Sequence, residues 1–568
     1  MRDDHASMIA LDGVTKRFGQ EVAVDDIHLS VGHGELCVLV GTSGCGKSTT
    51  LRMINRLIEH SAGEIRIEGQ QIRSFNPDQL RRRIGYAIQN TGLFPHWSVA
   101  RNIGLVPRLL KWPSTRIEAR VEELMSMLDL DFEAFAGKYP AQLSGGQAQR
   151  VGVARALAAD PDVLLMDEPF GALDPITRET LQEELLALQG RLKKTIVFVT
   201  HDMDEALKLA DRIVVMQAGR IVQQGTPMDL LGRPADAYVE SLLGGRDRGL
   251  KHASLMTVSA RMRHDSAVGA SDVEGVRNTD SLRDALSVML WRKTAQLPVL
   301  DGGGGAYRYT ALAGRDPGVA RMRQVRRANW RLLLWSLLLL VVVVALPHLD
   351  TLMRLWLPAM GDVIYRRDSF LALLGNHIAI VAIAGVIATA IGVGAGIAVT
   401  RDWGRDFLPL VSQLASIGQT FPPVAVLALS VPALGFGTVP TIIALVLYGL
   451  LPIVRNTLAG LQGIDADVME AAKGMGLSSM QRLWQVELPL ASTILLAGIR
   501  TSVTINIATA AIGSTIGAKT LGDPLIAGIV NGNGAYIVQG AIVIALLALC
   551  VDSIFERVGC GLAAYDQG

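Results

Sequence analysis

The sequence is short of cysteine, of aromatic side chains and of any excess of one charge. Aromatic residues make up 5% of the chain, and 54 Lys and Arg stand against 53 Asp and Glu, a formal net charge of +1. This balance gives no indication that the chain binds nucleic acid. The four cysteines show no metal-ligand spacing, so we expect free thiols in a reducing compartment rather than disulfides. They are Cys37, Cys45, Cys550 and Cys560.

The first residues also lack the apolar core of a signal peptide. Residues 1–5 are mostly polar, so the N-terminal part is expected to be cytoplasmic. At 568 residues the chain is too long for one domain, and we expect three or four. Charge is dispersed over residues 1–330, whereas residues 331–558 contain long apolar runs. This division predicts a soluble first half and a membrane-embedded second half.

A glycine-rich loop at residues 41–48 has the pattern G-x-x-x-x-G-K-[ST]. The apolar run before it and the helical spacing after it are the context in which this pattern binds phosphate. The glycines let backbone N–H groups surround the phosphates, and the following helix adds positive potential. Lys47 is expected to reach the β- and γ-phosphates, and the Ser48 hydroxyl to ligate Mg²⁺. The residues assigned here to the nucleotide are Gly41, Thr42, Ser43, Gly44, Cys45, Gly46, Lys47, Ser48 and Thr49.

Two further apolar runs end in side chains that suit phosphate chemistry. Residues 163–166 are followed by Asp167, which suits Mg²⁺ coordination, and Glu168, which suits polarising the water that attacks the γ-phosphate. Residues 195–200 lead to His201, whose imidazole would contact the γ-phosphate. Simple polar caps at strand ends are the alternative, which a P-loop in the same chain disfavours.

Together with a third motif, these residues resemble the nucleotide-binding domain of ABC transporters. Residues 143–147 read Leu-Ser-Gly-Gly-Gln, the signature of that family, and the likeness runs from residue 8 to about 243. It implies an α/β P-loop ATPase that dimerises head to tail, with ATP between the P-loop of one subunit and the signature of the other. It also implies that Gln89 acts in catalysis and at the metal, and that Glu168 and His201 are catalytic. The other residues that it assigns to the nucleotide are Phe18, Ser144, Gly145, Gly146, Gln147 and Asp174.

Phe18 stands where that family has an adenine-stacking aromatic residue, usually Tyr. A phenylalanine keeps the stacking face and loses only the hydroxyl. The alternative for Phe18 is an ordinary aromatic residue of the core.

Residues 244–330 form a linker that partly resembles a CBS motif. The pattern predicts a helix that begins at residues 279–282 and a short strand at 296–301. ATPases of quaternary-amine importers often carry CBS motifs in tandem, and one degenerate copy is visible here. A structural spacer is the alternative. Arginines crowd residues 321–331 and are expected to keep this end of the first span in the cytoplasm.

Residues 331–568 predict an all-α polytopic membrane domain. A span needs about 20 apolar residues, and with the ATPase inside, six spans would return the chain to the cytoplasm. Arg401 then lies inside, as the positive-inside rule prefers, whereas Arg366 and Arg367 lie outside. The expected spans are residues 331–348, 371–399, 407–431, 438–456, 490–514 and 535–556.

Two features of the membrane half bear on transport. Proline and glycine interrupt the apolar runs at residues 419–423 and 431–435, which indicates either a substrate path or ordinary helix kinks. The polar loop 457–489 contains Glu470-Ala471-Ala472 and Gly476, and it resembles the EAA loop of ABC importer permeases. In that family the loop forms a coupling helix that sits in a groove of the ATPase near the Q-loop.

The resemblances together imply half of an ABC importer, with ATPase and permease fused in one chain. The expected domains are 1–243 (ATPase), 244–330 (linker) and 331–568 (permease). As half of an importer, the chain would work as a homodimer in the cytoplasmic membrane. Residues 448–457 and 497–501 look like the permeases of glycine betaine, choline and carnitine importers, so the imported solute would be such an osmoprotectant.

Quaternary amines are bound by aromatic cages. No cage and no binding domain are evident here, so a separate extracytoplasmic substrate-binding protein is implied. The alternatives are an importer of another small solute, such as an amino acid or a sulfonate, an exporter and a regulatory ATPase. The ATPase-first order disfavours an exporter, and the spans disfavour a regulatory ATPase.

Overall fold

The structure is a computed structural model that divides into two compact units. The N-terminal unit comprises Met1–Leu312 and Ala466–Arg482, and the helical unit comprises Ala313–Asp465 and Leu483–Gly568. A short segment from the apolar half of the chain therefore packs as part of the N-terminal unit. The structure describes residues 7–171, 173, 175–244, 251, 276–277, 281, 299–300, 318–351, 354 and 362–566.

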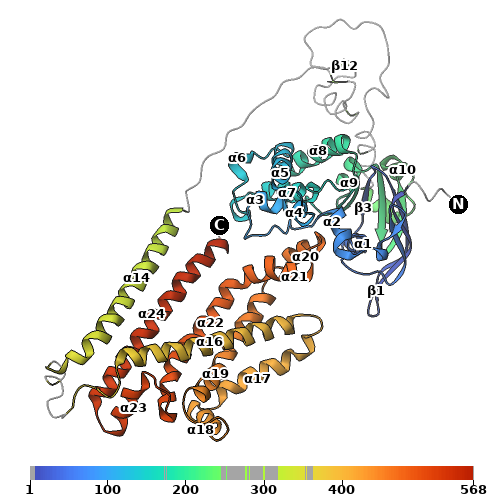
Figure 1. Ribbon diagram of the computed structural model, residues 1–568. Helices are drawn as coiled ribbons and strands as arrows, with labels where there is room; N and C mark the ends of the chain where they lie inside the picture. The colour runs from blue at the N-terminus through green and yellow to red at the C-terminus, as the bar shows by residue number, and fades with distance from the viewer. Residues whose placement is uncertain are drawn as a thin grey trace, which may run out of the picture. The chain divides into compact units, whose positions relative to one another are not determined.

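Two β-sheets form the strand part of the N-terminal unit (Figure 1). The strands are β1 (Ser7–Phe18), β2 (Glu21–Gly32), β3 (Leu36–Val40), β4 (Ala62–Ile67), β5 (Gln70–Gln71), β6 (Ile84–Ala87), β7 (Val163–Asp167), β8 (Thr195–Thr200), β9 (Arg212–Gln217) and β10 (Arg220–Gly225). One sheet has the order β10-β9-β3-β8-β7-β6 and is parallel except for β10, and the other is antiparallel, in the order β2-β1-β4-β5. Every residue of β3, β7 and β8 is buried, as in parallel strands covered on both faces.

Helices surround these sheets, and α3 to α7 gather on one side of the strands (Figure 1). The helices of the N-terminal unit are α1 (Lys47–Ile54), α2 (Pro77–Arg83), α3 (Val99–Ile103), α4 (Leu105–Leu109), α5 (Ser114–Met127), α6 (Phe132–Phe135), α7 (Gly145–Leu157), α8 (Pro175–Leu192), α9 (Met203–Leu209), α10 (Pro227–Gly232), α11 (Ala237–Leu243), α20 (Ala466–Gly474) and α21 (Ser479–Arg482). Side-chain caps begin several of them. The Asp202 carboxylate, for example, accepts hydrogen bonds from two N–H groups in the first turn of α9.

Most of the linker lies outside the described residues. Its described part contains a short parallel strand pair, β11 (Val276–Arg277) and β12 (Val299–Leu300). The strand predicted at 296–301 coincides with β12, whereas the helix predicted from residues 279–282 falls, apart from Ser281, outside the described residues. The likeness to a CBS motif therefore stays a prediction.

The helical unit contains five helices, among the residues that the structure describes, that are long and apolar enough to cross a membrane, and one of them begins with Ser479–Arg482 of the N-terminal unit. They cover Asn329–His348, Phe370–Thr400, Thr438–Gln462, Ser479–Ile516 and Gly534–Gly559. The helices of this unit are α14 (Gly318–Ala345), α16 (Phe370–Thr400), α17 (Leu408–Thr420), α18 (Pro423–Leu434), α19 (Thr438–Gln462), α22 (Leu488–Ala510), α23 (Gly522–Val530) and α24 (Gly534–Asp566).

The stretch expected to form a span at 407–431 is instead the helix pair α17 and α18. Phe421 and Pro422 between them are extended, because a proline donates no backbone hydrogen bond and disfavours a helical residue before it. The Tyr448 hydroxyl on α19 donates a hydrogen bond to the freed carbonyl oxygen of Phe421. Each helix of this pair is shorter than a span requires.

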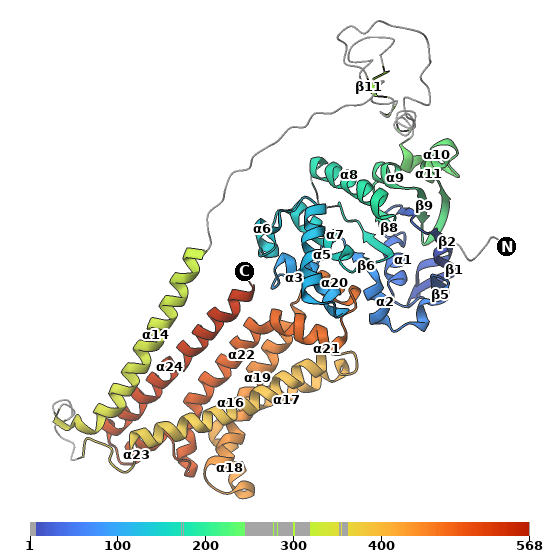
Figure 2. The same cartoon turned by 45° about the horizontal axis from the view of Figure 1, so that its top comes forward.

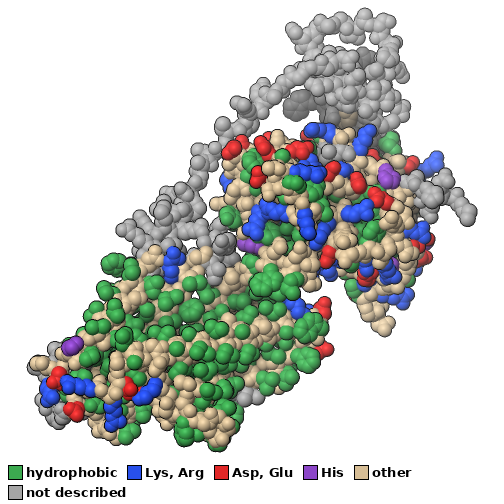
Figure 3. Space-filling model, viewed as in Figure 1, with side chains coloured by type: hydrophobic (Ala, Val, Ile, Leu, Met, Phe, Trp, Pro, Cys, Tyr) green, Lys and Arg blue, Asp and Glu red, His purple; other side chains and the backbone are tan. Residues whose placement is uncertain are grey.

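Hydrophobic side chains cover most of the face of the helical unit seen in Figure 3, and charged side chains gather at the end where α23 lies. Arg366 and Arg367 precede α16, and Arg401 follows it, so they stand at opposite ends of that span as expected. Arg401 forms a bidentate ion pair with the buried Glu487 carboxylate. Charges at span ends suit a bilayer, and Arg500 and Asp552, which lie inside two of the spans, form an ion pair with two hydrogen bonds of 2.6 Å.

Candidate nucleotide site and coupling seat

The carboxyl ends of three neighbouring parallel strands bring the predicted catalytic residues together. Strands β3, β8 and β7 are adjacent in the sheet. The P-loop follows β3, Glu168 follows β7 and His201 follows β8. These groups therefore lie at one edge of the sheet, which is where ligands bind in open α/β folds.

The P-loop closes tightly on the start of α1. Gly46 has a φ of 103°, and a Cβ at this position would lie 2.7 Å from the carbonyl oxygen of Ala23. Only glycine fits such a position. Lys47 is buried, and its Nζ donates hydrogen bonds to the carbonyl oxygens of Gly41 (2.7 Å) and Thr42 (3.0 Å). The ammonium group is thus held within the loop.

Ser48 and Asp167 form an oxygen pair suited to a hard cation. The Ser48 hydroxyl donates to the Asp167 carboxylate at 2.8 Å. Burial raises the pKa of Asp167, and the hydrogen bond from Ser48 opposes that shift. A buried carboxylate with a raised pKa gains from a nearby cation, and Mg²⁺ prefers one or two carboxylates with substrate phosphates. No group of three or more His, Cys, Asp or Glu that could hold a metal occurs among the described residues.

Gln89 and His201 converge on Glu168. The Gln89 Nε2 donates to the Glu168 carboxylate at 2.8 Å, and the His201 Nδ1 lies 3.2 Å from the same carboxylate oxygen. Glu168 itself has a φ of 44°, a left-handed backbone that costs energy in a residue other than glycine. The structure therefore brings together three of the residues predicted to be catalytic.

The signature residues open helix α7. The Ser144 hydroxyl accepts from the Gln147 N–H, and the Gln147 side chain accepts from the Ser144 N–H, which is a capping box. Ser144 and Gly145 are exposed, and Gly146 and Gln147 are partly buried. The first turn of α7 thus presents backbone N–H groups and positive potential to solvent, as an anion-binding helix start does.

Two other predicted nucleotide residues lie in different surroundings, and a third is not described. Phe18 ends β1 with 49% of its surface exposed, and the Lys16 ammonium lies 4.7 Å from its ring centre, so Phe18 is not a core aromatic residue. Thr49 is partly buried in α1. Asp174 falls outside the described residues.

Helix α20, from the loop expected to couple the two halves, packs beside β6 within the N-terminal unit (Figure 2). The Glu470 carboxylate accepts from Arg52 Nε at 2.8 Å and from the Tyr86 hydroxyl at 2.7 Å. Burial, and next the Glu470 charge, raise the pKa of Tyr86 well above its usual value. The phenol therefore stays a neutral donor.

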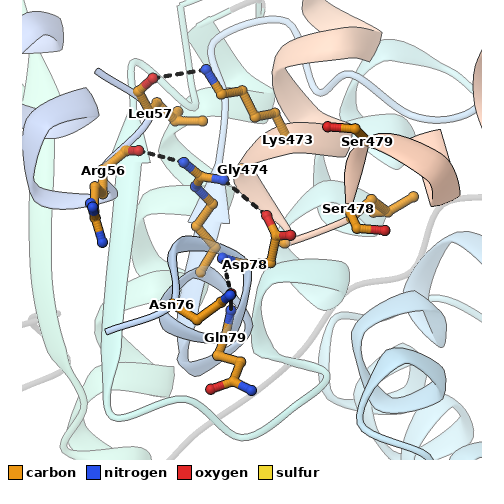
Figure 4. A network of polar contacts seen from close by, with 12 residues as sticks. Arg56, Leu57, Asn76, Asp78, Gln79, Lys473, Gly474, Ser478 and Ser479 are labelled. Carbon is orange, nitrogen blue, oxygen red and sulfur yellow. Dashed lines mark hydrogen bonds and ion pairs between the residues drawn. The ribbon is translucent and has the colours of Figure 1, made fainter. Parts of the chain in front are cut away.

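We call the surface of the N-terminal unit that contacts α20, which includes Arg52, Leu57 and Tyr86, the seat of α20. Other contacts of the seat use backbone carbonyl groups. Lys473 Nζ donates to the carbonyl oxygen of Leu57 at 2.9 Å, as Figure 4 shows, and Asn55 Nδ2 donates to that of Gly474 at 3.2 Å. A Cβ on Gly474 would lie 2.4 Å from a ring carbon of Tyr86. The backbone of α20 at Gly474 therefore lies close against the Tyr86 ring.

The sequence-based prediction missed Arg52, Asn55, Tyr86, Asn90 and Arg155 on the N-terminal side of the seat. Arg155 interrupts an apolar run and Tyr86 places a hydroxyl group within one, which is the one local signal that each carries. It also missed Tyr238 on α11. The Tyr238 hydroxyl accepts from the Thr42 N–H and donates to the Met216 carbonyl oxygen, both at 3.2 Å.

An apolar cavity of about 730 Å³ lies within the helical unit, between α16, α17, α18 and α19. Its lining includes Phe421, at the break between α17 and α18, and one hydroxyl, that of Ser430. A single aromatic ring does not form a cage for a quaternary amine.

Comparisons with known proteins match both halves of the chain. The ABC transporter family matches residues 24–171, and the family of binding-protein-dependent transport system inner membrane components matches residues 388–560. The chain is 53% identical to the glycine betaine uptake system ATP-binding protein YehX of Escherichia coli, over 52% of this chain and 94% of that protein.

Two further similarities concern the N-terminal half. The chain is 48% identical to the osmoprotectant import ATP-binding protein OsmV of Salmonella typhimurium, over 57% of this chain and 81% of that protein. A solved dimeric ATP-binding cassette with bound ADP and phosphate is 34% identical, with a TM-score of 0.36, over 39% of this chain and 99% of that one.

Proposed function

The chain belongs to the ABC transporters of the glycine betaine, choline and carnitine import type, with ATPase and permease fused, and we propose that two copies together import a quaternary-amine osmoprotectant. It binds nucleotide and couples ATP hydrolysis to transport. It is a multi-pass membrane protein whose ATPase domain is cytoplasmic. We propose limits of 1–243 for the ATPase, 244–330 for the linker and 331–568 for the permease.

One short segment carries this proposal, because it touches both the catalytic carboxylate and the coupling helix. Within residues 86–92, Gln89 donates to Glu168, while Tyr86 donates to Glu470 and Asn90 Nδ2 donates to Asp467 at 2.8 Å. A change in the γ-phosphate site therefore has a direct mechanical route to α20. Coupling of this kind requires that the two transport states differ in nucleotide affinity.

The residues at the sheet edge divide the chemistry of hydrolysis. Lys47 supplies positive charge to the phosphates, and Glu168 polarises the attacking water. Gln89 and His201 orient the Glu168 carboxylate through the contacts described above. The exposed Phe18 ring offers a stacking face for adenine.

Ser48, Asp167 and Gln89 are the residues that would hold Mg²⁺. The Ser48–Asp167 oxygen pair and the raised pKa of Asp167 support this assignment. The ion would neutralise charge on the β- and γ-phosphates. Because the open helix start at Ser144, Gly145, Gly146 and Gln147 suits a phosphate, a second copy would complete each nucleotide site, and Asp174 is assigned to the same composite site.

A separate extracytoplasmic substrate-binding protein would deliver the substrate. The permease half matches a family described as binding-protein-dependent, and the apolar cavity lined by α16, α17, α18 and α19 contains a single aromatic ring. The YehX similarity supports glycine betaine as the substrate class. An amino acid or a sulfonate is the alternative substrate.

Replacing Glu168 by Gln tests the catalytic assignment. The amide keeps the size of the side chain and can still accept from Gln89, but it polarises water poorly. We expect unchanged ATP affinity and a fall in turnover of about 10²–10⁴-fold, measured by phosphate release. Glu184→Gln, which alters a carboxylate paired with Arg150, is the control. Wild-type turnover in Glu168→Gln would contradict the assigned role.

Competitive uptake tests the substrate class. Cells that express the chain with its binding protein should accumulate radiolabelled glycine betaine, and excess choline or carnitine should compete. Excess amino acid or sulfonate should not. Uptake of a sulfonate in place of glycine betaine would replace the proposed substrate while leaving the ATPase assignment intact.

A further inference from the structure

Arg155 on the signature helix α7 is the charged side chain most completely removed from water in the N-terminal unit, among the residues that the structure describes. It is 1% exposed. Within the described residues no carboxylate pairs with it. Burial lowers the pKa of Arg155 to about 9, so the guanidinium stays charged at neutral pH.

The Arg155 guanidinium donates hydrogen bonds to the backbone of the segment that follows Gln89. Its NH1 donates to the Gly92 carbonyl oxygen at 2.8 Å, and its NH2 donates to the Thr91 carbonyl oxygen. The same guanidinium lies 5.7 Å from the ring centre of Phe94. A planar fork that reaches two carbonyl groups at once fixes an orientation, which a point charge does not.

The Thr91–Gly92 turn has a left-handed backbone and leaves no space for a side chain at Gly92. Thr91 and Gly92 have φ values of 57° and 49°, both left-handed. A Cβ on Gly92 would lie 2.8 Å from the Asp467 carbonyl oxygen and 2.9 Å from the Ala471 Cβ, both on α20. The turn therefore forms the surface on which α20 rests.

We propose that Arg155 is a positioning residue for coupling: it fixes the Thr91–Gly92 turn to helix α7 and so holds the seat of α20 in register with the signature. This inference rests on the proposed coupling of ATP hydrolysis to transport. It gives the buried charge a use, because a guanidinium without a carboxylate is otherwise costly to bury. It also ties the signature, the segment after Gln89 and α20 into one chain of contacts.

The test replaces Arg155 by Lys, which keeps the charge but cannot reach both carbonyl groups as a fork. Amide hydrogen exchange is measured in the nucleotide-free full-length protein in detergent. We expect exchange over residues 466–474 to rise about tenfold, the factor of one lost charge-assisted hydrogen bond. Exchange in β3 and β7 should not change, because the hydrogen bonds of the guanidinium go to the Thr91–Gly92 turn.

Arg120→Lys is the matched control. Arg120 is also largely buried and donates to the carbonyl oxygen of Leu157, the last residue of α7, but it does not contact the turn. It should leave exchange over 466–474 unchanged. In Arg155→Lys we expect KM for ATP to stay within about twofold while kcat falls, since the P-loop is not altered.

Unchanged exchange over 466–474 in Arg155→Lys would overturn the inference, whatever happens to ATPase activity. So would an equal rise over the whole of α7 and the core strands, because that pattern means general loosening. Arg155→Met also removes the charge, and if that protein does not fold, Arg155→Lys still decides. Failure of the proposed function would appear elsewhere, as normal turnover in Glu168→Gln.

Discussion

The nucleotide site and the seat of α20 belong to the same unit but are built from different polar groups. At the nucleotide site, the residues proposed for metal binding and catalysis contact one another through side chains, as in the pairs Ser48–Asp167 and Gln89–Glu168, while Lys47 donates to P-loop carbonyl groups. At the seat, side-chain donors also reach backbone carbonyl groups, including those of Leu57, Thr91, Gly92, Gly474 and Gly476.

The nucleotide site therefore depends mainly on the chemical groups of its side chains, and the seat mainly on the shape of the surfaces that meet there. A site made of side chains depends on which atoms they carry, so an isosteric change of one atom disables it. The seat depends on the close approach of backbones, so a single added methyl group is expected to weaken it. Each substitution below changes one property and keeps the other.

Asp167→Asn, which keeps the shape and removes the charge, should have the largest effect on the nucleotide site. We expect hydrolysis to fall about 10³-fold or more, because the proposed metal loses its carboxylate. Coupling-helix contacts should be unchanged. Phosphate release measures the first, and hydrogen exchange over residues 466–474 measures the second. Retention of more than a tenth of the activity would contradict the metal assignment.

The same substitution should stabilise the nucleotide-free protein by about 1–3 kcal/mol. The folded pKa of Asp167 is raised above the ordinary value of 3.8, so the folded state binds the proton more tightly than the unfolded state. The wild type therefore loses stability as pH rises through the window from 3.8 to the folded pKa. Asn removes that loss, and urea unfolding at pH 3 and pH 7 would show it.

Gly474→Ala adds one methyl group at the seat and no new chemistry. That methyl group would lie 2.4 Å from the Tyr86 ring, and we expect the overpacking to weaken the seating of α20 by about 1–3 kcal/mol. Uptake should fall at least fivefold while ATP affinity stays unchanged. Gly190→Ala in α8, where a Cβ meets open space, is the control. Normal uptake in Gly474→Ala would contradict the close approach.

The Arg52–Glu470 pair is one of the places where the seat depends on side-chain chemistry, so it tests the comparison between the two sites. Its side chains are 41% and 25% exposed, which limits the strength of the ion pair. A double-mutant cycle of Arg52→Met and Glu470→Gln should give a coupling energy of about 1 kcal/mol in urea unfolding. A value near zero would leave the Tyr86 hydroxyl as the sole partner of Glu470 that matters.

Tyr238→Phe should have the smallest effect. It removes one hydroxyl that links the Thr42 N–H to the Met216 carbonyl oxygen. We expect ATP affinity to fall by about 0.5–1.5 kcal/mol, or two- to tenfold, as measured by equilibrium binding. An unchanged affinity would show that water replaces the hydroxyl at no cost.

The sequence predicted which side chains gather at the edge of the sheet, whereas it left out most contacts of the seat. Lys47, Asp167, Glu168 and His201 lie where strand ends bring them, because their side chains define recognisable motifs. Arg155 holds carbonyl groups, which every residue carries, so no motif marks its partners. The break at Phe421 was visible as prolines, but its consequence, two short helices in place of a span, depends on Tyr448 and α19.

Helix α20 completes a surface whose other residues are made much earlier during translation. Tyr86 and Glu470 are separated by 384 positions, so the seat leaves the ribosome long before α20 does. Until α20 is made, the surface that it covers with Ala471 and Ala472 is exposed to chaperones and to other apolar segments. Completion of the N-terminal unit is therefore a late event in biogenesis, and residues 1–243 expressed alone would expose an apolar patch that favours aggregation.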